Sequence, residues 1–174
     1  KNLALYTRLG LEPRYLTLLM RGGLARAALP HYERWKGGDA LARIAGQLVP
    51  GLDPTPAALW LETEQAGDTL IWREGGQPVA FAVLRHAMRR LQSPPSFVTV
   101  EAAACLPDAA DRWPTYLAEM QTYAQTRGLG GLILPVNARQ LTLTHALLDA
   151  GLQIAFTRVR LATGGWLGAP DALL

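Results

Sequence analysis

The sequence predicts an α/β (α+β) fold with a mixed, mostly antiparallel sheet and helices on both faces. Apolar residues recur at helical spacing in several segments that Gly or Pro interrupts. Runs rich in β-branched and aromatic residues lie between these segments and are typical of strands. With 174 residues, 49% hydrophobic and 18% charged, the chain can bury a sizeable core.

The first two elements are expected to be a helix and a strand. Residues 1–10 carry Leu3, Tyr6 and Leu9 on one stripe and end at a Gly, and 13–20 reads as a strand. This apolar stripe needs a sheet against which to pack, and the sequence opens without Met. For these two reasons we interpret the chain as a fragment of a longer protein. The strand would seek a sheet edge, either in the following unit or in a neighbouring chain.

Two helices and a hairpin are predicted next. Apolar spacing indicates helices over 32–48 and 57–64, which Pro50-Gly51 separates. The β-type runs 69–73 and 79–84 flank a short loop that contains Gly, and this arrangement predicts a β-hairpin.

The C-terminal part is expected to alternate between strands and helices. After a loop at 88–95, the pattern predicts a strand at 97–105, a helix at 110–126, a strand at 131–136, a helix at 138–150 and a strand at 152–161. The run 131–136 is apolar throughout, as in strands that are buried on both faces.

Composition narrows the possible functions. Apolar runs fall far short of the roughly 18 residues that span a bilayer, and the single Cys105 cannot form an internal disulfide, so cytoplasm is the default location. His31, His86 and His145 lack metal-ligand spacing. The net charge of +3 permits an anionic ligand, and the basic cluster 85–90 leaves nucleic-acid binding as a weak third hypothesis.

The segment Asn2 to Leu11 resembles the signature of the last helix of GNAT N-acetyltransferases, which reads Asn, Ala and then Leu-Tyr-x-x-Leu-Gly-Phe. The order of helix, Gly and strand recurs from Val136 to Leu152. Together with the hairpin and the strand 97–105, this resemblance covers most of the chain from 32 to 161. It implies the C-terminal part of a tandem GNAT protein, with 1–23 ending one unit and 24–174 forming a second, degenerate one.

This resemblance implies transfer of an acyl group, other than an aminoacyl group, from acetyl-CoA to a small-molecule or peptide amine. Tyr6 would protonate the thiolate that leaves, the alternative being a core tyrosine. Glu101 would be the general base that deprotonates the amine, the alternative being a solvent-facing side chain.

The resemblance also places the binding site for acetyl-CoA. The strand residues Val100, Ala102 and Ala104 would contact the cofactor, together with Arg112 and Asn137. For Arg112, a solvated side chain is the alternative.

The sequence departs from the family at its phosphate-binding turn. Residues 107–115 lack every glycine of that turn, Pro114 has no N–H to donate, and Asp108 and Asp111 would repel a pyrophosphate. Leu147 stands where the first copy has its tyrosine. A second hypothesis is therefore a non-catalytic GNAT-like module that supports an upstream unit of the same chain or forms a homodimer interface.

Overall fold

In the computed structural model, residues 8–23, 29–48, 52–87 and 96–162 are described, and all structural statements concern these residues. Tyr6, most of the predicted first helix and the loop 88–95 lie outside them. The elements are β1 (Glu12–Gly22), β2 (Glu33–Arg34), α2 (Ala40–Leu48), α3 (Thr55–Thr63), β3 (Gly67–Glu74), β4 (Gln77–Arg85), β5 (Val98–Cys105), the 3₁₀ helix η1 (Pro107–Arg112), α4 (Trp113–Thr126), β6 (Leu132–Asn137), α5 (Leu141–Asp149) and β7 (Gln153–Ala162).

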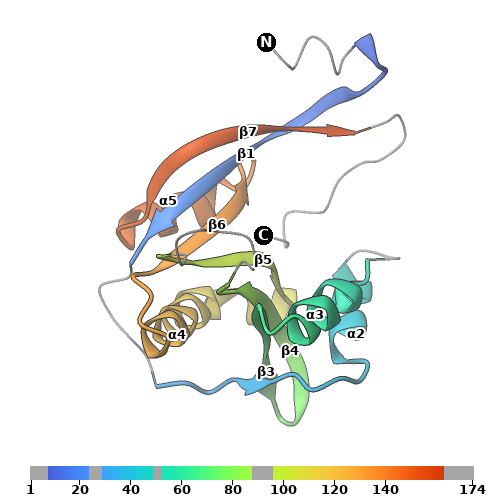
Figure 1. The fold of residues 1–174 in the computed structure, drawn as a ribbon, viewed down its shortest axis with the longest axis vertical. Coiled ribbons are helices and arrows are strands. Elements are labelled where there is room, and N and C mark those ends of the chain that lie inside the picture. Colours follow the sequence, from blue (N-terminus) through green and yellow to red (C-terminus); the bar gives the residue numbers. More distant parts are fainter. Residues whose placement is uncertain (1–7, 24–28, 49–51, 88–95, 163–174) are drawn as a thin grey trace.

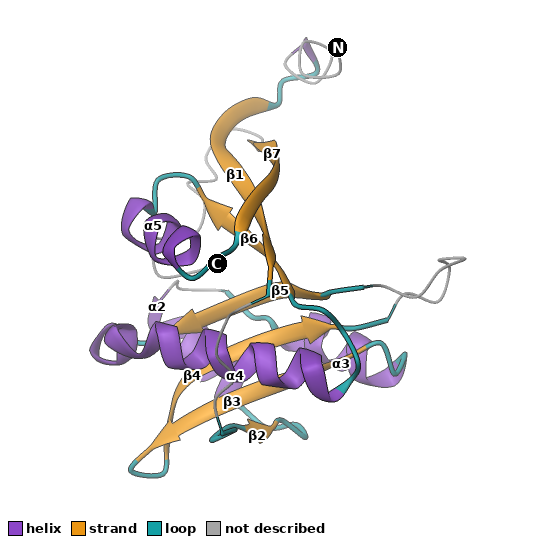
Figure 2. Cartoon of the chain, turned by 90° about the vertical axis from the view of Figure 1, so that its left-hand side faces the viewer, coloured by secondary structure: helices purple, strands orange, loops and turns teal. Residues whose placement is uncertain are grey.

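One seven-stranded sheet organises the fold (Figures 1 and 2). Its strand order is β2-β3-β4-β5-β6-β1-β7. The pair β5 and β6 is parallel, and the other neighbouring strands are antiparallel. The predicted mixed, mostly antiparallel sheet is thus confirmed.

Helices cover both faces of the sheet, as predicted. Leu41 and Ile44 of α2 and Leu61 of α3 pack on one face against Phe81 and Val83 of β4. Side chains of α4 and α5 pack on the other face. Alternate residues of each strand point to opposite faces, so the two helical layers bury nearly every side chain of the central strands.

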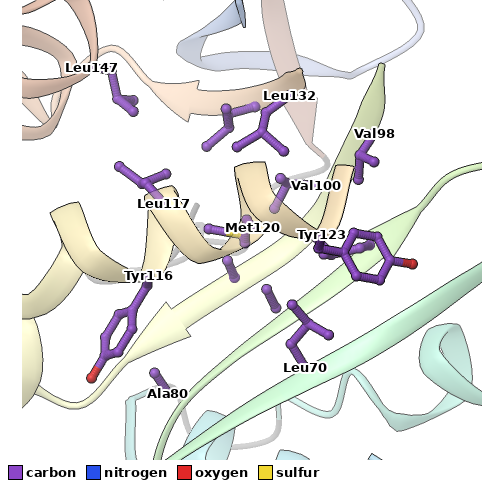
Figure 3. Packing of buried hydrophobic residues seen from close by; sticks show 14 of the residues in the cluster. Leu70, Ala80, Val98, Val100, Tyr116, Leu117, Met120, Tyr123, Leu132 and Leu147 are labelled. Carbon is purple, nitrogen blue, oxygen red and sulfur yellow. The ribbon is translucent and has the colours of Figure 1, made fainter. Parts of the chain in front are cut away.

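The helix α4 forms the centre of the second layer. Figure 3 shows Leu117 and Met120 of this helix among Val100, Leu132 and Leu147. All five side chains are buried. Because this packing joins β5, β6 and α5 to one helix, it fixes where the ends of these elements lie.

The end of α4 follows from its sequence. Gly128 has a φ of 70°, in the left-handed region that glycine tolerates best. Its N–H donates to the carbonyl of Gln125, and the N–H of Leu129 donates to the carbonyl of Ala124. These bonds satisfy carbonyls of the last helical turn.

The predicted helix 32–48 is wrong in its first half. Tyr32 instead packs edge to face on Trp72, with ring centroids 6.1 Å apart, and β2 pairs with β3. Gly37 and Gly38 both have positive φ, which a helix does not accept, so α2 begins only at Ala40.

The strand β1 joins the sheet of this chain, which is one of the two places expected for it, but it lies between β6 and β7 and not at an edge. Met20 is opposite Leu134 on one side and Ile154 on the other. Both partners of β1 belong to this chain, and α5 carries the chain from β6 to β7, leaving room between them for a strand (Figure 1). The assignment of 1–23 to a preceding unit stays a prediction.

None of the helices in the described ranges is both long enough and apolar enough to pass through a bilayer.

Candidate functional site

Two neighbouring parallel strands separate in the middle of the sheet. Pairing between β5 and β6 covers Val98 with Leu132 and Thr99 with Ile133, and no further residue of β5 pairs with β6. Figure 2 shows β3, β4 and β5 lying side by side as antiparallel strands, while β1 and β7 rise away from them. The backbone of β5 after Thr99 therefore faces an opening in place of a strand on that side.

A β-bulge in β5 coincides with this separation. Val83 of β4 is opposite Ala102, but the next residue, Leu84, is opposite Val100, so Glu101 is the extra residue of the bulge. A bulge bends its strand and increases its twist. We attribute the divergence of β5 from β6 to this bend.

A cavity of about 740 Å³ lies beyond the opening, at the ends of β5 and β6. Its walls are the end of β5, η1 with the first turn of α4, and the loop and first turns of α5. The lining residues are Cys105, Pro107, Ala110, Asp111, Trp113, Pro114, Arg139, Gln140, Leu141, Thr142, Leu143 and Ala146. Such a volume suits a ligand of the size of a small cofactor.

The lining formed by the described residues is mostly apolar and carries one charge of each sign. Asp111 comes from the η1 wall and Arg139 from the loop before α5. Neither side chain makes an ion pair with any described residue. Leu141 is 63% exposed on the α5 wall, so an apolar surface remains accessible there.

Two weakly acidic groups near the cavity stay protonated. Burial raises the pKa of the Cys105 thiol to about 11, so this cysteine is not a thiolate nucleophile at neutral pH. Burial, followed by the charge of Glu74, raises the pKa of Tyr116 to about 12. The Tyr116 ring lies against Trp72, with centroids 4.8 Å apart, and this residue does not line the cavity.

The three strand residues predicted to contact the cofactor lie on both faces of β5. Val100 is buried beneath α4, before the bulge. Ala104 is buried in the cluster with α2 and α3, and Ala102 packs against that cluster. Their side chains do not line the cavity, so any contact with a ligand would use the backbone of the open strand edge.

The other predicted residues are engaged with neighbours. Glu101 forms an ion pair with Arg85 and is 38% exposed, which agrees with a solvent-facing residue. Arg112 forms an ion pair with Glu74 at 2.8 Å. Asn137 ends β6, and its Oδ1 accepts the backbone N–H of Arg139 at 3.0 Å. None of these three predicted residues lines the cavity, and their roles stay predictions.

The lining residues in α5 and in the loop before it were not predicted, whereas Asp111 and Pro114 were considered only as departures from the family's phosphate-binding turn. Arg139 and Leu141 are remote in sequence from Asp111, and local patterns do not show that the two segments meet. The sequence held a partial signal. Leu141 and Leu143 are apolar, although the core face of the same helix is already supplied by the buried Leu147, so a second apolar surface could have been expected.

A second polar cluster occupies the opposite end of the sheet. Tyr123 of α4 donates to Asp68 of β3 at 2.6 Å, and Nδ1 of His86 lies 2.9 Å from the Tyr123 hydroxyl. Arg127 pairs with Asp68 and stacks over the Tyr123 ring, 4.0 Å from its centroid. Burial and then the Asp68 bond raise the pKa of Tyr123. This cluster ties the last turns of α4 to β3 and β4.

The cluster predicts a loss of stability at mildly acidic pH. Burial, followed by the charge of Arg127, lowers the pKa of His86 below 6.5. The imidazole of His86 therefore binds a proton more tightly in the unfolded chain than in the folded one. Its contribution to the free energy of unfolding is complete above about pH 6.5 and is lost as the pH falls toward the pKa of the folded state. The free energy of unfolding, measured by urea denaturation at about pH 7.5 and about pH 5.5, should drop less in a His86→Gln variant. An equal drop in both proteins would contradict this role.

Among the described residues, no group of His, Cys, Asp and Glu side chains could hold a metal ion.

Comparison by sequence finds no matching protein family and no similar curated protein. Solved structures, however, share the fold. An acetyltransferase assigned to the GNAT family from Novosphingobium aromaticivorans is 17% identical with a TM-score of 0.60, over 89% of this chain and 68% of that one.

Two further structures agree with this result. A GNAT-family acetyltransferase from Colwellia psychrerythraea is 14% identical with a TM-score of 0.60, over 90% of this chain and 60% of that one. A GCN5-related N-acetyltransferase from Sphaerobacter thermophilus is 16% identical with a TM-score of 0.53, over 90% and 54%. The chain therefore has the GNAT fold, and it spans little more than half the length of these last two proteins.

Proposed function

We propose that this chain, which has the GNAT fold, binds an acyl thioester of coenzyme A and transfers the acyl group to an amine. The observation that carries the proposal is the opening between β5 and β6, which begins at the bulge of Glu101 and leads to the 740 Å³ cavity. An open strand edge beside a mostly apolar cavity can hold an extended ligand that contains amide groups. The pantetheine part of coenzyme A is such a ligand.

The chain would act mainly through its backbone. N–H groups of β5 beyond Thr99 have no partner strand on the side of β6. Held in a fixed strand, such donors can stabilise the oxyanion that forms when the amine attacks the thioester carbonyl. The carbon–nitrogen bond forms, the carbon–sulfur bond breaks, and the sulfur leaves as a thiolate that takes up the proton lost by the amine nitrogen, which gives the free thiol.

The second candidate function is a non-catalytic module that supports an upstream GNAT unit or a homodimer. Leu147 is fully buried at the position where the resemblance expects an acidic tyrosine, so it supplies no proton to a thiolate. Arg112 is bound to Glu74, which weakens its availability to a phosphate. These two observations favour a chain that binds the thioester without catalysing transfer, or one that neither binds it nor catalyses transfer.

Calorimetric titration of the folded chain with acetyl-CoA, with coenzyme A alongside, separates the two functions. Binding at micromolar concentration is expected from the cavity, and subsequent release of free thiol in the presence of amines would establish transfer. Absence of binding to a folded sample would reject the acyltransferase proposal for this chain and leave the supporting module.

Filling the cavity should abolish this binding. Ala146 lies on α5, is exposed and lines the cavity, so the indole of an Ala146→Trp variant would occupy the ligand's volume. We expect the Kd for acetyl-CoA to rise more than about tenfold, with the free energy of unfolding within about 0.5 kcal/mol of the parent.

The matched control is Leu148→Trp on the same helix. Leu148 is 40% exposed and does not line the cavity. This variant should bind acetyl-CoA like the parent chain. Equal weakening by both variants would indicate a general effect on α5 and would argue against the cavity as the binding site.

A further inference from the structure

The charges around the cavity do not match those of a complete coenzyme A. Among the lining residues that the structure describes, Arg139 is the single cation, and Asp111 faces the same space with a negative charge. The formal charges of these described residues therefore cancel. Coenzyme A carries a diphosphate and a further phosphate, and its negative charges would meet one arginine and one carboxylate.

The turn before α4 adds no compensation. Arg112 forms its ion pair with Glu74 at 2.8 Å and is not among the described residues that line the cavity. Asp108 adds a second carboxylate in the first turn of η1. Pro114 lies in the first turn of α4 and has no N–H to donate to a phosphate. The place where a diphosphate would meet a helix N-terminus is thus acidic and short of donors.

The remaining lining is neutral and mostly apolar. Trp113, Pro107 and Leu143 provide apolar surface, and Thr142 provides a hydroxyl. The backbone edge of β5 supplies donors and acceptors for amide groups. A neutral, extended chain with two amides fits this combination, with one anionic group at its end for the guanidinium of Arg139, which pairs with no described residue.

We propose that the ligand of this cavity is a phosphopantetheine thioester with a single phosphate, which Arg139 binds, in preference to complete coenzyme A. This inference rests on the proposed acyl transfer and specifies the donor. This phosphopantetheine thioester, called the arm below, exists as a free compound and as the prosthetic group of a carrier protein. Both sources share the chemistry that the cavity recognises.

Titration with S-acetyl-4′-phosphopantetheine beside acetyl-CoA tests the proposal. The arm is expected to bind more tightly than acetyl-CoA. Acetyl-CoA that binds as tightly as the arm, or more tightly, would overturn the preference while leaving the proposed function intact. Failure of both ligands to bind the folded chain would reject the function and the inference together.

A carrier protein that holds the acetylated arm provides the third titration. Tighter binding than the free arm would identify the carrier-linked arm as the source. Equal or weaker binding would identify the free compound. Both results support the recognised chemistry once the free arm has bound.

Variants of the two charged lining residues supply an independent readout. Arg139→Gln should raise the Kd for the arm about tenfold, because a charge-assisted bond to the phosphate is lost. Asp111→Asn should lower the Kd for acetyl-CoA by a several-fold larger factor than the Kd for the arm. The substitution removes a negative charge, which repels the more highly charged ligand most strongly.

Arg158→Gln is the matched control for Arg139→Gln. Arg158 is an exposed arginine of β7 that does not line the cavity. Its replacement makes the same change in net charge and should leave both dissociation constants unaltered. An unchanged Kd for the arm in Arg139→Gln would overturn the assignment of Arg139 as the phosphate ligand.

Discussion

Replacing Glu119 with alanine is expected to lower the free energy of unfolding by about 3 kcal/mol. Glu119 is 1% exposed on α4, and its Oε2 accepts the indole N–H of Trp72 at 2.8 Å and the backbone N–H of His31 at 2.9 Å. Alanine would leave these donors without their acceptor. The loss would also detach the segment before β2 from the helix. Urea denaturation of the two proteins measures the difference.

Two controls separate the hydrogen bonds from other effects. Glu119→Gln keeps a side-chain carbonyl oxygen that can accept both bonds in place of Oε2 but removes the negative charge of the acceptor, so it should cost about 1 kcal/mol. Glu62→Ala removes an exposed glutamate from α3 and should change the free energy of unfolding by less than about 0.5 kcal/mol. If Glu119→Ala were as mild as Glu62→Ala, the bonds to Trp72 and His31 would not contribute to stability.

A methyl group at Gly131 should destabilise the fold by about 3 kcal/mol or more. The Cβ of an alanine there would overlap the carbonyl of Gly22, which belongs to β1. The atoms in its way are backbone, so relief requires β1 and β6 to move apart where Gly22 pairs with Leu132. Because β1 also holds β7, hydrogen exchange should accelerate in both strands.

Gly46→Ala makes the same chemical change with the opposite expected sign. Gly46 lies in the exposed face of α2, and an added Cβ meets no atom within 4 Å. Alanine in a helix interior is favoured over glycine by about 0.5 to 1 kcal/mol. Chemical denaturation should therefore show a gain for Gly46→Ala and a loss for Gly131→Ala. A similar effect of both substitutions would contradict the close approach of β1 and β6.

Elements with strong local signals were predicted well from the sequence. The hairpin of β3 and β4 turns at Gly75 and Gly76, both with positive φ, between two runs of β-type residues. The long helix α4 was predicted from its apolar spacing and the Gly that follows it. These features depend on neighbours in the sequence, so the pattern of residues determines them.

One polar residue in α4 was not singled out, although a signal was present. Glu119 lies on the same helical face as Tyr116 and Tyr123, where a core residue is expected. A carboxylate at such a position must find donors. Which donors it finds depends on β3 and on the segment before β2, and these reach α4 only in the folded chain.

The sequence by itself determined the mixed sheet, the helical layers and the absence of glycine from residues 107–115. Tertiary structure decided the rest: β1 lies between β6 and β7, Glu101 forms a bulge, and Asp111 and Arg139 line one cavity. The physical reason is the range of the interactions. Turns and helical stripes are set by neighbouring residues, whereas the position of β1 and the separation of β5 from β6 arise from pairing and packing between distant segments.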